Sequence, residues 1–226
     1  MSGKMKKALL FDFDGVIIDS ERIRYATYEK LFQQEFGVQI PHFDPFIIGR
    51  KQEVNLQMLL EASGVEADIS TLVSKRNLLL QETFRDYNNI MPVPGLLPFL
   101  SQAKEKGYGL GIASSSTAQY ILPIVEYLRI RNKFDAIITS EDIPGDRGKP
   151  HPDVYLLASQ RMGIPPEKCL VFEDSLHGIA AAKAAGMYCV AVATSFRKEE
   201  LEGKADDVID DFTNVTINSF FEFHNL

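Results

Sequence analysis

Two aspartates lie close together near the start of the chain, in the run FDFDG at residues 11–15. They close a short apolar stretch, residues 7–13, that is typical of a strand buried on both faces. Side chains at positions i and i+2 of a strand point to the same side, so Asp12 and Asp14 would be neighbours. Two neighbouring buried carboxylates repel each other unless a cation neutralises them, and Mg²⁺ prefers such oxygen ligands. The pair therefore predicts a magnesium site, although two exposed loop acids would give the same pattern.

Three further polar groups occur along the chain, each beside an apolar run or in a stiff loop. Ser114 follows the run GLGIA, where its hydroxyl and nearby backbone N–H groups could hold phosphoryl oxygens. Lys149 lies in the loop sequence GKPHPD, which its prolines stiffen. Glu173 and Asp174 form a second acidic pair after the run CLVF. Each group alone has an ordinary explanation, namely a helix N-cap for Asp174 and a solvated surface charge for Lys149.

Apolar runs suited to buried strands alternate with helical patterns over most of the chain. The strand-like runs are residues 7–13, 108–113, 136–139, 169–172 and 188–192, and the helical patterns are residues 95–106, 117–128, 152–162 and 176–185. Ser116 or Thr117 is expected to cap the second of these helices. The alternation predicts an α/β fold with a doubly wound parallel sheet. Because the carboxyl ends of parallel strands lie at one edge, we expect the polar groups to converge there.

The stretch from about residue 18 to residue 89 interrupts this alternation. Its three helical patterns, at residues 20–36, 51–63 and 69–87, are accompanied by no strand pattern of comparable quality. We therefore expect an all-helical cap domain at residues 18–90, inserted into a core domain formed by residues 1–17 and 91–226. A cap over the carboxyl ends of the strands would lie where open α/β sheets bind their ligands.

The run DFDGVIIDS, residues 12–20, resembles the first motif of the haloacid dehalogenase (HAD) superfamily of phosphotransferases. Ser114, Lys149 within GKPHPD and the acidic pair at residues 173–174 are similar to the other three motifs, in the family's order. The similarity extends over residues 7–192, and the helical insertion resembles the C1-type cap of some members. The resemblance implies a Rossmann-like HAD core that carries out Mg²⁺-dependent phosphoryl transfer.

The resemblance also implies a role for each motif residue. Asp12 would attack phosphorus to give an aspartyl-phosphate, and Asp14 would serve as general acid for the leaving alcohol and then as general base for water. Ser114 and Lys149 would stabilise charge on the transferring oxygens, and Ser115 would contact the substrate. The dehalogenases of the superfamily lack an aspartate at the position of Asp14, so its presence favours transfer to or from an alcohol oxygen.

The ligands of the metal ion follow from the same resemblance. Mg²⁺ would be held by the Asp12 carboxylate, the Asp14 backbone carbonyl and the Asp174 carboxylate, with Glu173 nearby or bound through water. A phospho-accepting receiver domain, which carries similar acids, a hydroxyl and a lysine but signals without turnover, is an alternative interpretation. The chain length and the inserted cap disfavour it. An inactive binding protein on this fold is a third interpretation, which the complete set of motif residues disfavours.

Two enzyme classes with this type of cap resemble the chain, the sugar-phosphate phosphatases and the β-phosphoglucomutases. Arg50 lies where the mutases carry an arginine that grips the non-transferring phosphate. Arg24 lies where they carry a histidine tied to the timing of the general acid, which disfavours a mutase cycle. We therefore expect a phosphatase for a small phosphorylated metabolite, such as a sugar or polyol phosphate, with Arg24 and Arg50 among the substrate contacts. A phosphomutase is the alternative.

The composition of the chain indicates which kinds of partner the protein binds and which it does not. The 226 residues carry a net charge of −7, which argues against nucleic acid because phosphate backbones bind basic surfaces. The sequence contains no apolar run of the ~18 residues that cross a bilayer, and the acids at residues 12 and 14 rule out a signal peptide. Cys169 and Cys189 are too few for a disulfide framework. We expect a cytoplasmic monomer or weak homodimer, in which the run FFEF at residues 220–223 covers a sheet edge or contacts another subunit.

Overall fold

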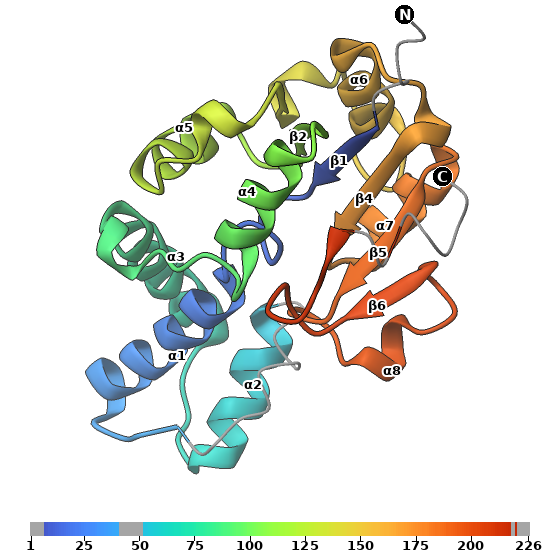
Figure 1. The fold of residues 1–226 in the computed structure, drawn as a ribbon. Coiled ribbons are helices and arrows are strands. Elements are labelled where there is room, and N and C mark those ends of the chain that lie inside the picture. The colour runs from blue at the N-terminus through green and yellow to red at the C-terminus, as the bar shows by residue number, and fades with distance from the viewer. Residues whose placement is uncertain (1–6, 41–51, 218–219, 221–226) are drawn as a thin grey trace, which may run out of the picture. The chain divides into compact units, whose positions relative to one another are not determined.

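The computed structural model describes residues 7–40, 52–217 and 220. The chain divides into two compact units, a core unit of Met1–Ile18 with Pro92–Leu226 and a cap unit of Asp19–Met91. The core unit contains the sheet, and the described part of the cap unit is helical (Figure 1). Each boundary between the units lies one residue after the position expected from the sequence.

Six parallel strands form the sheet of the core unit, in the order β3-β2-β1-β4-β5-β6. They are β1 Ala8–Phe11, β2 Gly109–Ala113, β3 Ala136–Ile138, β4 Cys169–Glu173, β5 Tyr188–Val192 and β6 Asp207–Ile209. The chain builds outward from β1 to β3 on one side and from β4 to β6 on the other, so β1 and β4 meet at the point where the winding reverses. The predicted doubly wound α/β class is confirmed. The sequence did not predict β6, because its three residues are only half-buried and form too short an apolar run.

Helices and short 3-10 turns connect the strands. The helices of the core unit are α4 Leu96–Glu105, α5 Ala118–Tyr127, α6 Asp153–Met162, α7 Leu176–Ala184 and α8 Lys198–Leu201, and its 3-10 turns are η3 Arg131–Lys133, η4 Ser140–Asp142 and η5 Pro166–Lys168. Gly163 ends α6 in the left-handed conformation, with φ of 64°.

Both faces of the sheet are covered, and every position of the strands β1, β2 and β4 is buried. Leu10 and Val171 face one side, where they belong to a buried cluster with residues of α6 and α7. On the other side Phe11 stacks on Phe172 with 5.1 Å between ring centroids, and Phe99 of α4 meets Phe11 edge-on at 6.4 Å. Each fully buried side chain of this size contributes roughly 1.5–3 kcal/mol relative to an exposed one. The packing therefore fixes the register that aligns the ends of β1 and β4.

The cap unit contains the helices α1 Ser20–Phe36, α2 Gln52–Ser63 and α3 Ile69–Arg85, followed by the 3-10 turn η2 Tyr87–Asn89. The side chains of Asp19 and Asp68 cap α1 and α3 by accepting backbone N–H groups of their first turns. The three helices share one apolar core, which includes Tyr28, Leu31, Phe32, Leu56, Leu59, Leu60 and Leu72. In the part of the chain that the structure describes, no helix combines the length and apolarity needed to cross a membrane.

Candidate active site

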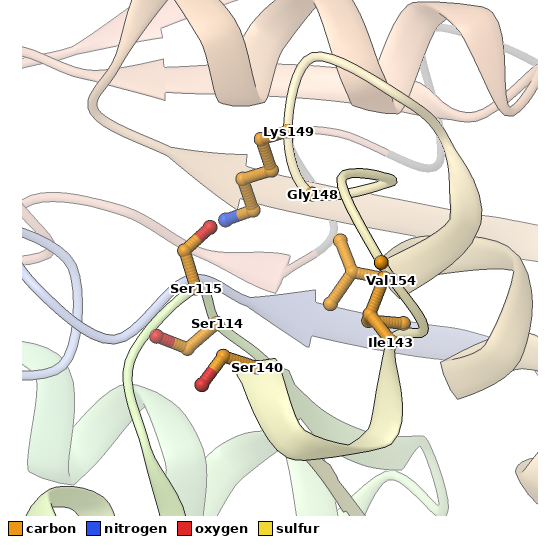
Figure 2. Close-up of a pocket in the computed structure, with 8 residues that line it drawn as sticks. Ser114, Ser115, Ser140, Ile143, Gly148, Lys149 and Val154 are labelled. Atoms are coloured by element: carbon orange, nitrogen blue, oxygen red, sulfur yellow. The ribbon is translucent and has the colours of Figure 1, made fainter.

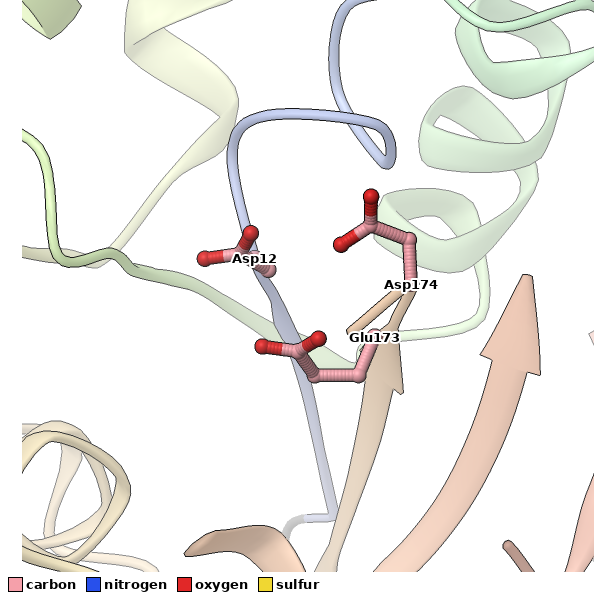
Figure 3. A group of neighbouring side chains, drawn as sticks. All are labelled: Asp12, Glu173 and Asp174. Carbon is pink, nitrogen blue, oxygen red and sulfur yellow. The ribbon is translucent and has the colours of Figure 1, made fainter. Parts of the chain in front are cut away.

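Strands β1 and β4 end side by side and carry three acids of the predicted site. They pair in parallel with Phe11 opposite Phe172, so the residues that follow, Asp12 and Glu173, arrive at the same edge of the sheet. The backbone N–H of Asp12 donates to the carbonyl of Phe172 at 3.0 Å, which extends the register beyond β1. Asp12, Glu173 and Asp174 are buried, and each places a carboxylate oxygen within 4.8 Å of the others (Figure 3). The geometry expected from the strand ends is therefore present.

Gly15 allows the chain to turn directly against Asp174. Its φ is +75°, and a Cβ at this position would lie 1.9 Å from Asp174 Oδ2, so any other residue would have to displace the Asp174 side chain. The hydroxyl of Thr194 donates to the carbonyl of Gly15 at 2.6 Å, and the hydroxyl of Ser195 donates to Asp174 Oδ2. These two residues follow β5, a strand end that the sequence analysis did not include in the site. The alternative role of Asp174 as a helix cap is wrong, because Ser175 caps α7.

Lys149 joins two of the acids. Its ammonium nitrogen lies 2.5 Å from Asp12 Oδ1 and 2.6 Å from Glu173 Oε1, and its side chain is only 6% exposed. The same nitrogen lies 4.9 Å from the centre of the Tyr155 ring, which belongs to the first turn of α6. The alternative of a solvated surface lysine is therefore wrong.

Glu173 receives four hydrogen-bond donors. Lys149 and the hydroxyl of Tyr155, at 3.0 Å, donate to Oε1. The backbone N–H and the hydroxyl of Ser175 donate to Oε2, at 2.7 and 3.0 Å. A carboxylate oxygen accepts about two such bonds, so both oxygens are occupied. Glu173 thus anchors Lys149, and a direct bond to a metal ion would have to displace one of these donors.

Three buried carboxylates and one ammonium leave this cluster with an excess of negative charge. Burial raises the pKa of Asp12 from 3.8 to about 7, an effect that Lys149 opposes and Glu173 strengthens. Burial also holds the pKa of Asp174 well above its usual range, and the charges of Glu173 and Asp12 add to this effect. Burial disfavours the charged form of Lys149, but attraction to Asp12 and Glu173 outweighs it and raises the lysine pKa. A divalent cation between Asp12 and Asp174 would relieve the repulsion, and their oxygen donors fit Mg²⁺.

Ser114 is the first residue after β2 and is 2% exposed. Its backbone N–H donates to the carbonyl of Ile138 at 3.0 Å, and its hydroxyl oxygen accepts the N–H of Ser116 at 3.0 Å. Ser115 is exposed, and Figure 2 shows its hydroxyl directed toward the ammonium end of Lys149. The two serines thus border the cluster from the β2 side.

The residues expected to cap α5 do not use their side chains in that way. Thr117 occupies the N-cap position without a side-chain hydrogen bond, and the carboxylate of Glu141 accepts the N–H of Ala118 at 3.0 Å instead. The hydroxyl of Ser116 donates to Asp14 at 2.8 Å. The prediction that Ser116 or Thr117 caps the helix is therefore confirmed for the position of Thr117, whereas the side chain that accepts the first N–H of the helix is that of Glu141.

The carboxylate of Asp14 contacts the segment that follows β2, whereas Asp12 contacts Lys149. Asp14 is half-buried, and each of its two carboxylate oxygens accepts a hydroxyl. Ser116 donates to Oδ2 at 2.8 Å, and Tyr120 donates to Oδ1 at 3.1 Å. Sequence reasoning missed Tyr120, because a tyrosine inside an amphipathic helix gives no signal of a polar contact.

A cavity of about 120 Å³ lies beside Ser114 and Lys149 (Figure 2). The lining residues are Ser114, Ser115, Ser140, Ile143, Gly145, Gly148, Lys149 and Val154. Hydroxyl groups and an ammonium around a small, partly enclosed space suit an anion such as a phosphoryl group.

The two arginines predicted to contact the substrate, Arg24 and Arg50, belong to the cap unit. Arg50 lies outside the described residues. Arg24 is part of α1, and its guanidinium pairs with Glu21 at 3.2 Å while its side chain is 38% exposed. A role of either arginine toward the substrate stays a prediction.

Known proteins are similar to this chain in sequence and in fold. The family model described as haloacid dehalogenase-like hydrolase matches residues 9–192. A phosphorylated carbohydrates phosphatase from Thermotoga maritima is 29% identical over 182 residues, which cover 80% of this chain and 82% of that protein. β-Phosphoglucomutase from Bacillus subtilis is 30% identical over 196 residues, which cover 82% and 83%. The crystal structure of β-phosphoglucomutase from Clostridium difficile has a TM-score of 0.66 at 26% identity and covers 98% of each chain.

The family match begins in β1 and ends with β5, so it includes every core residue that the motifs singled out. It spans well over half of the chain, and the parallel sheet agrees with it. The chain is therefore an enzyme that belongs to the haloacid dehalogenase-like hydrolase family, as its four motifs predicted.

Proposed function

We propose that this chain is a Mg²⁺-dependent phosphatase that hydrolyses the phosphate ester of a sugar or polyol through an aspartyl-phosphate on Asp12. The observation that supports this most strongly is the setting of the Asp12 carboxylate, which is buried, lies 2.5 Å from the ammonium of Lys149 and lies within 4.8 Å of Asp174. Such a carboxylate is held in one orientation, as an attacking group must be. The relatives named as a carbohydrate phosphatase and a phosphoglucomutase support the substrate class.

In the first step, a carboxylate oxygen of Asp12 forms a bond to phosphorus while the bond from phosphorus to the ester oxygen breaks. The ester oxygen takes a proton from the carboxyl group of Asp14 and departs as an alcohol. Lys149 and Ser114 donate to the phosphoryl oxygens on which negative charge accumulates. The cavity beside these two residues offers space for the phosphoryl group.

In the second step, water attacks the phosphorus of the aspartyl-phosphate. Asp14, now a carboxylate, accepts the proton of this water, and the bond between phosphorus and Asp12 breaks. Phosphate leaves, and both aspartates return to their starting forms.

The Asp12 and Asp174 carboxylates and the backbone carbonyl of Asp14 would hold Mg²⁺. The ion, when bound, neutralises the acids and polarises the phosphoryl oxygens. The four donors on Glu173 support a contact of this residue with the ion through water. Ser195 and the turn at Gly15 position Asp174 for the ion.

A phosphomutase is the second candidate, because β-phosphoglucomutases are similar over most of the chain. A mutase must pass the phosphoryl group from Asp12 back to a second hydroxyl of the sugar, whereas a phosphatase needs only water. Arg24 in place of the histidine expected of a mutase favours hydrolysis. A receiver-type signalling domain differs from both, since it would hold its phosphate without turnover.

Phosphate release from a panel of sugar, polyol and nucleotide monophosphates tests the proposal. The protein is freed of metal with EDTA and assayed with and without added Mg²⁺, and the panel includes β-glucose 1-phosphate with its bisphosphate activator. We expect Mg²⁺-dependent release from sugar or polyol phosphates and none from the Asp12→Asn variant. Asp211→Asn, which exchanges an aspartate that the proposed reaction does not use, should retain activity. Conversion of β-glucose 1-phosphate to glucose 6-phosphate would favour the mutase. Stable phosphorylation without turnover would favour the receiver domain.

A further inference from the structure

The hydroxyl of Tyr120 contacts the second aspartate of the site, and none of the steps proposed above uses it. The Tyr120 hydroxyl donates to Asp14 Oδ1 at 3.1 Å, and the Ser116 hydroxyl donates to the other carboxylate oxygen, Oδ2, at 2.8 Å. One donor on each oxygen fixes the plane of a carboxylate as well as its position. A single donor would leave the group free to rotate about that contact.

The ring of Tyr120 is held independently of its hydroxyl. It packs edge-on against Phe13, with 5.7 Å between the ring centroids and 80° between the planes. Phe13 lies between the two aspartates in sequence and is fully buried. Tyr120 belongs to the first turn of α5, where Glu141 binds the first backbone N–H of the helix. The hydroxyl is therefore presented to Asp14 by two rigid elements, the end of β1 and the start of α5.

Asp14 itself lies beyond the end of β1, in an isolated bridge with Ile18 directly before a turn. Gly15, with φ of +75°, follows Asp14 directly, and the side chain of Asp14 is half-buried. The backbone alone therefore does not restrict the carboxyl group of Asp14 to one direction. Transfer of a proton to a leaving oxygen requires the donor within about 2.6–3.2 Å of that oxygen. A misplaced carboxyl group would slow this step without altering the binding of the phosphoryl group by Lys149 and Ser114.

We propose that Tyr120 is a positioning residue, which with Ser116 directs the Asp14 carboxyl group toward the leaving oxygen of the ester. The proposal rests on the proposed function, because it assigns Tyr120 to the alcohol-protonation step of that reaction. It specifies which substrates depend on Tyr120. Alkyl phosphates, whose alkoxide leaves poorly, require the proton of Asp14, whereas p-nitrophenyl phosphate releases a stable nitrophenolate and does not.

The test compares Tyr120→Phe, which keeps the ring and its packing on Phe13, with Tyr127→Phe. Tyr127 lies at the other end of the same helix and is 45% exposed, so this control removes the same hydroxyl from α5. Single-turnover experiments with excess enzyme measure the maximal rate constant of ester cleavage and the half-saturating concentration for p-nitrophenyl phosphate and for the alkyl phosphate that the wild type hydrolyses fastest. The second step, in which Asp14 acts with either ester, then does not limit the measured rate. We expect Tyr120→Phe to lower the cleavage rate constant for the alkyl ester about tenfold, which corresponds to one hydrogen bond to a charged group of ~1.5 kcal/mol. The cleavage rate constant for the aryl ester and the half-saturating concentration of both esters change less than about twofold.

A double variant shows whether Tyr120 acts through Asp14. In the Asp14→Asn background, Tyr120→Phe should cause no further loss with the alkyl ester. Equal losses for the two esters, a further loss in the Asn background or faster turnover of Tyr120→Phe would overturn the proposal. If Asp14→Asn leaves alkyl ester hydrolysis intact, the proposed reaction itself fails. If Asp14→Asn lowers that hydrolysis and Tyr120→Phe does not, only the role of Tyr120 fails.

Discussion

The two ion pairs of Lys149 give a quantitative prediction. Lys149→Met keeps the length of the side chain and removes its charge, which leaves Asp12 and Glu173, 11% and 0% exposed, without their shared cation. Removal of one partner from a buried ion pair destabilises a protein by about 3–5 kcal/mol. We expect the free energy of unfolding of the metal-free protein at pH 8 to fall by ~3 kcal/mol or more.

The loss should depend on pH in a defined direction. The pKa of Asp12 is raised from 3.8 to about 7 in the folded protein, and Lys149 limits this rise. A folded-state pKa above the unfolded value means that the folded protein binds the proton more tightly, so the contribution of this group to stability falls as pH rises through the interval between the two values. Without Lys149 the folded-state pKa of Asp12 rises further, so the pH interval over which this group loses its contribution to stability extends to higher pH. The destabilisation by Lys149→Met is therefore larger at pH 8 than at pH 5, where a proton substitutes for the ammonium.

The matched control is Lys104→Met. Lys104 lies 2.9 Å from Asp135, but the two side chains are 33% and 47% exposed, and exposed pairs contribute only about 0–1 kcal/mol. Both variants and the wild type are unfolded with urea in EDTA at pH 8 and pH 5, and the transition is followed by circular dichroism. Similar losses for the two variants at pH 8, or the same loss at both pH values for Lys149→Met, would refute the reasoning.

Three further predictions follow from single contacts. Gly15→Ala places a Cβ 1.9 Å from Asp174 Oδ2 and should lower activity by roughly 100-fold or more. Gly37→Ala, with φ of 67° and no atom within 4 Å of the new Cβ, should cost only about 1–2 kcal/mol of stability and leave kcat unchanged. Tyr155→Phe removes a donor to a buried carboxylate and should destabilise the protein by about 1.5–3 kcal/mol in urea unfolding, and a loss under about 0.5 kcal/mol would show that this hydrogen bond contributes little. Burial raises the pKa of Cys169 to about 12 and also raises that of Cys189. A thiol reagent at pH 8 should therefore label no cysteine in the native protein and two cysteines after unfolding. Rapid labelling of the native protein would contradict the burial of both thiols.

Much of the site was predictable because parallel strands end at one edge. Asp12, Ser114 and Asp174 each lie at or just beyond the end of an apolar run, and no structural information beyond the direction of the strands was needed to bring them together. Lys149 follows no such rule. Its position at the cluster was expected only from the resemblance of its loop to a family motif. Without that resemblance, no pattern in the sequence distinguishes this lysine from another lysine in a loop.

Other residues of the site were not predicted from the sequence, each for a physical reason. Tyr120 and Tyr155 occupy the first turns of helices, where a tyrosine looks the same in sequence whether its hydroxyl meets solvent or a carboxylate. Ser195 follows β5 and could have been found by the strand-end rule applied to one more strand. Ser116 was one of two residues expected to cap α5, because local patterns favour the nearest N–H group over the side chain of Asp14, which is 102 positions away in sequence.

Trapping the covalent intermediate tests the central claim most directly. The Asp14→Asn variant is mixed with p-nitrophenyl phosphate and Mg²⁺, since this ester leaves without the general acid and the variant lacks the base for the second step. We predict a burst of about one nitrophenolate per chain, followed by slow turnover, and a hydroxylamine-labile phosphate that mass spectrometry locates on Asp12. Phosphate on any other residue, or steady turnover with no phosphorylated protein, would contradict the account.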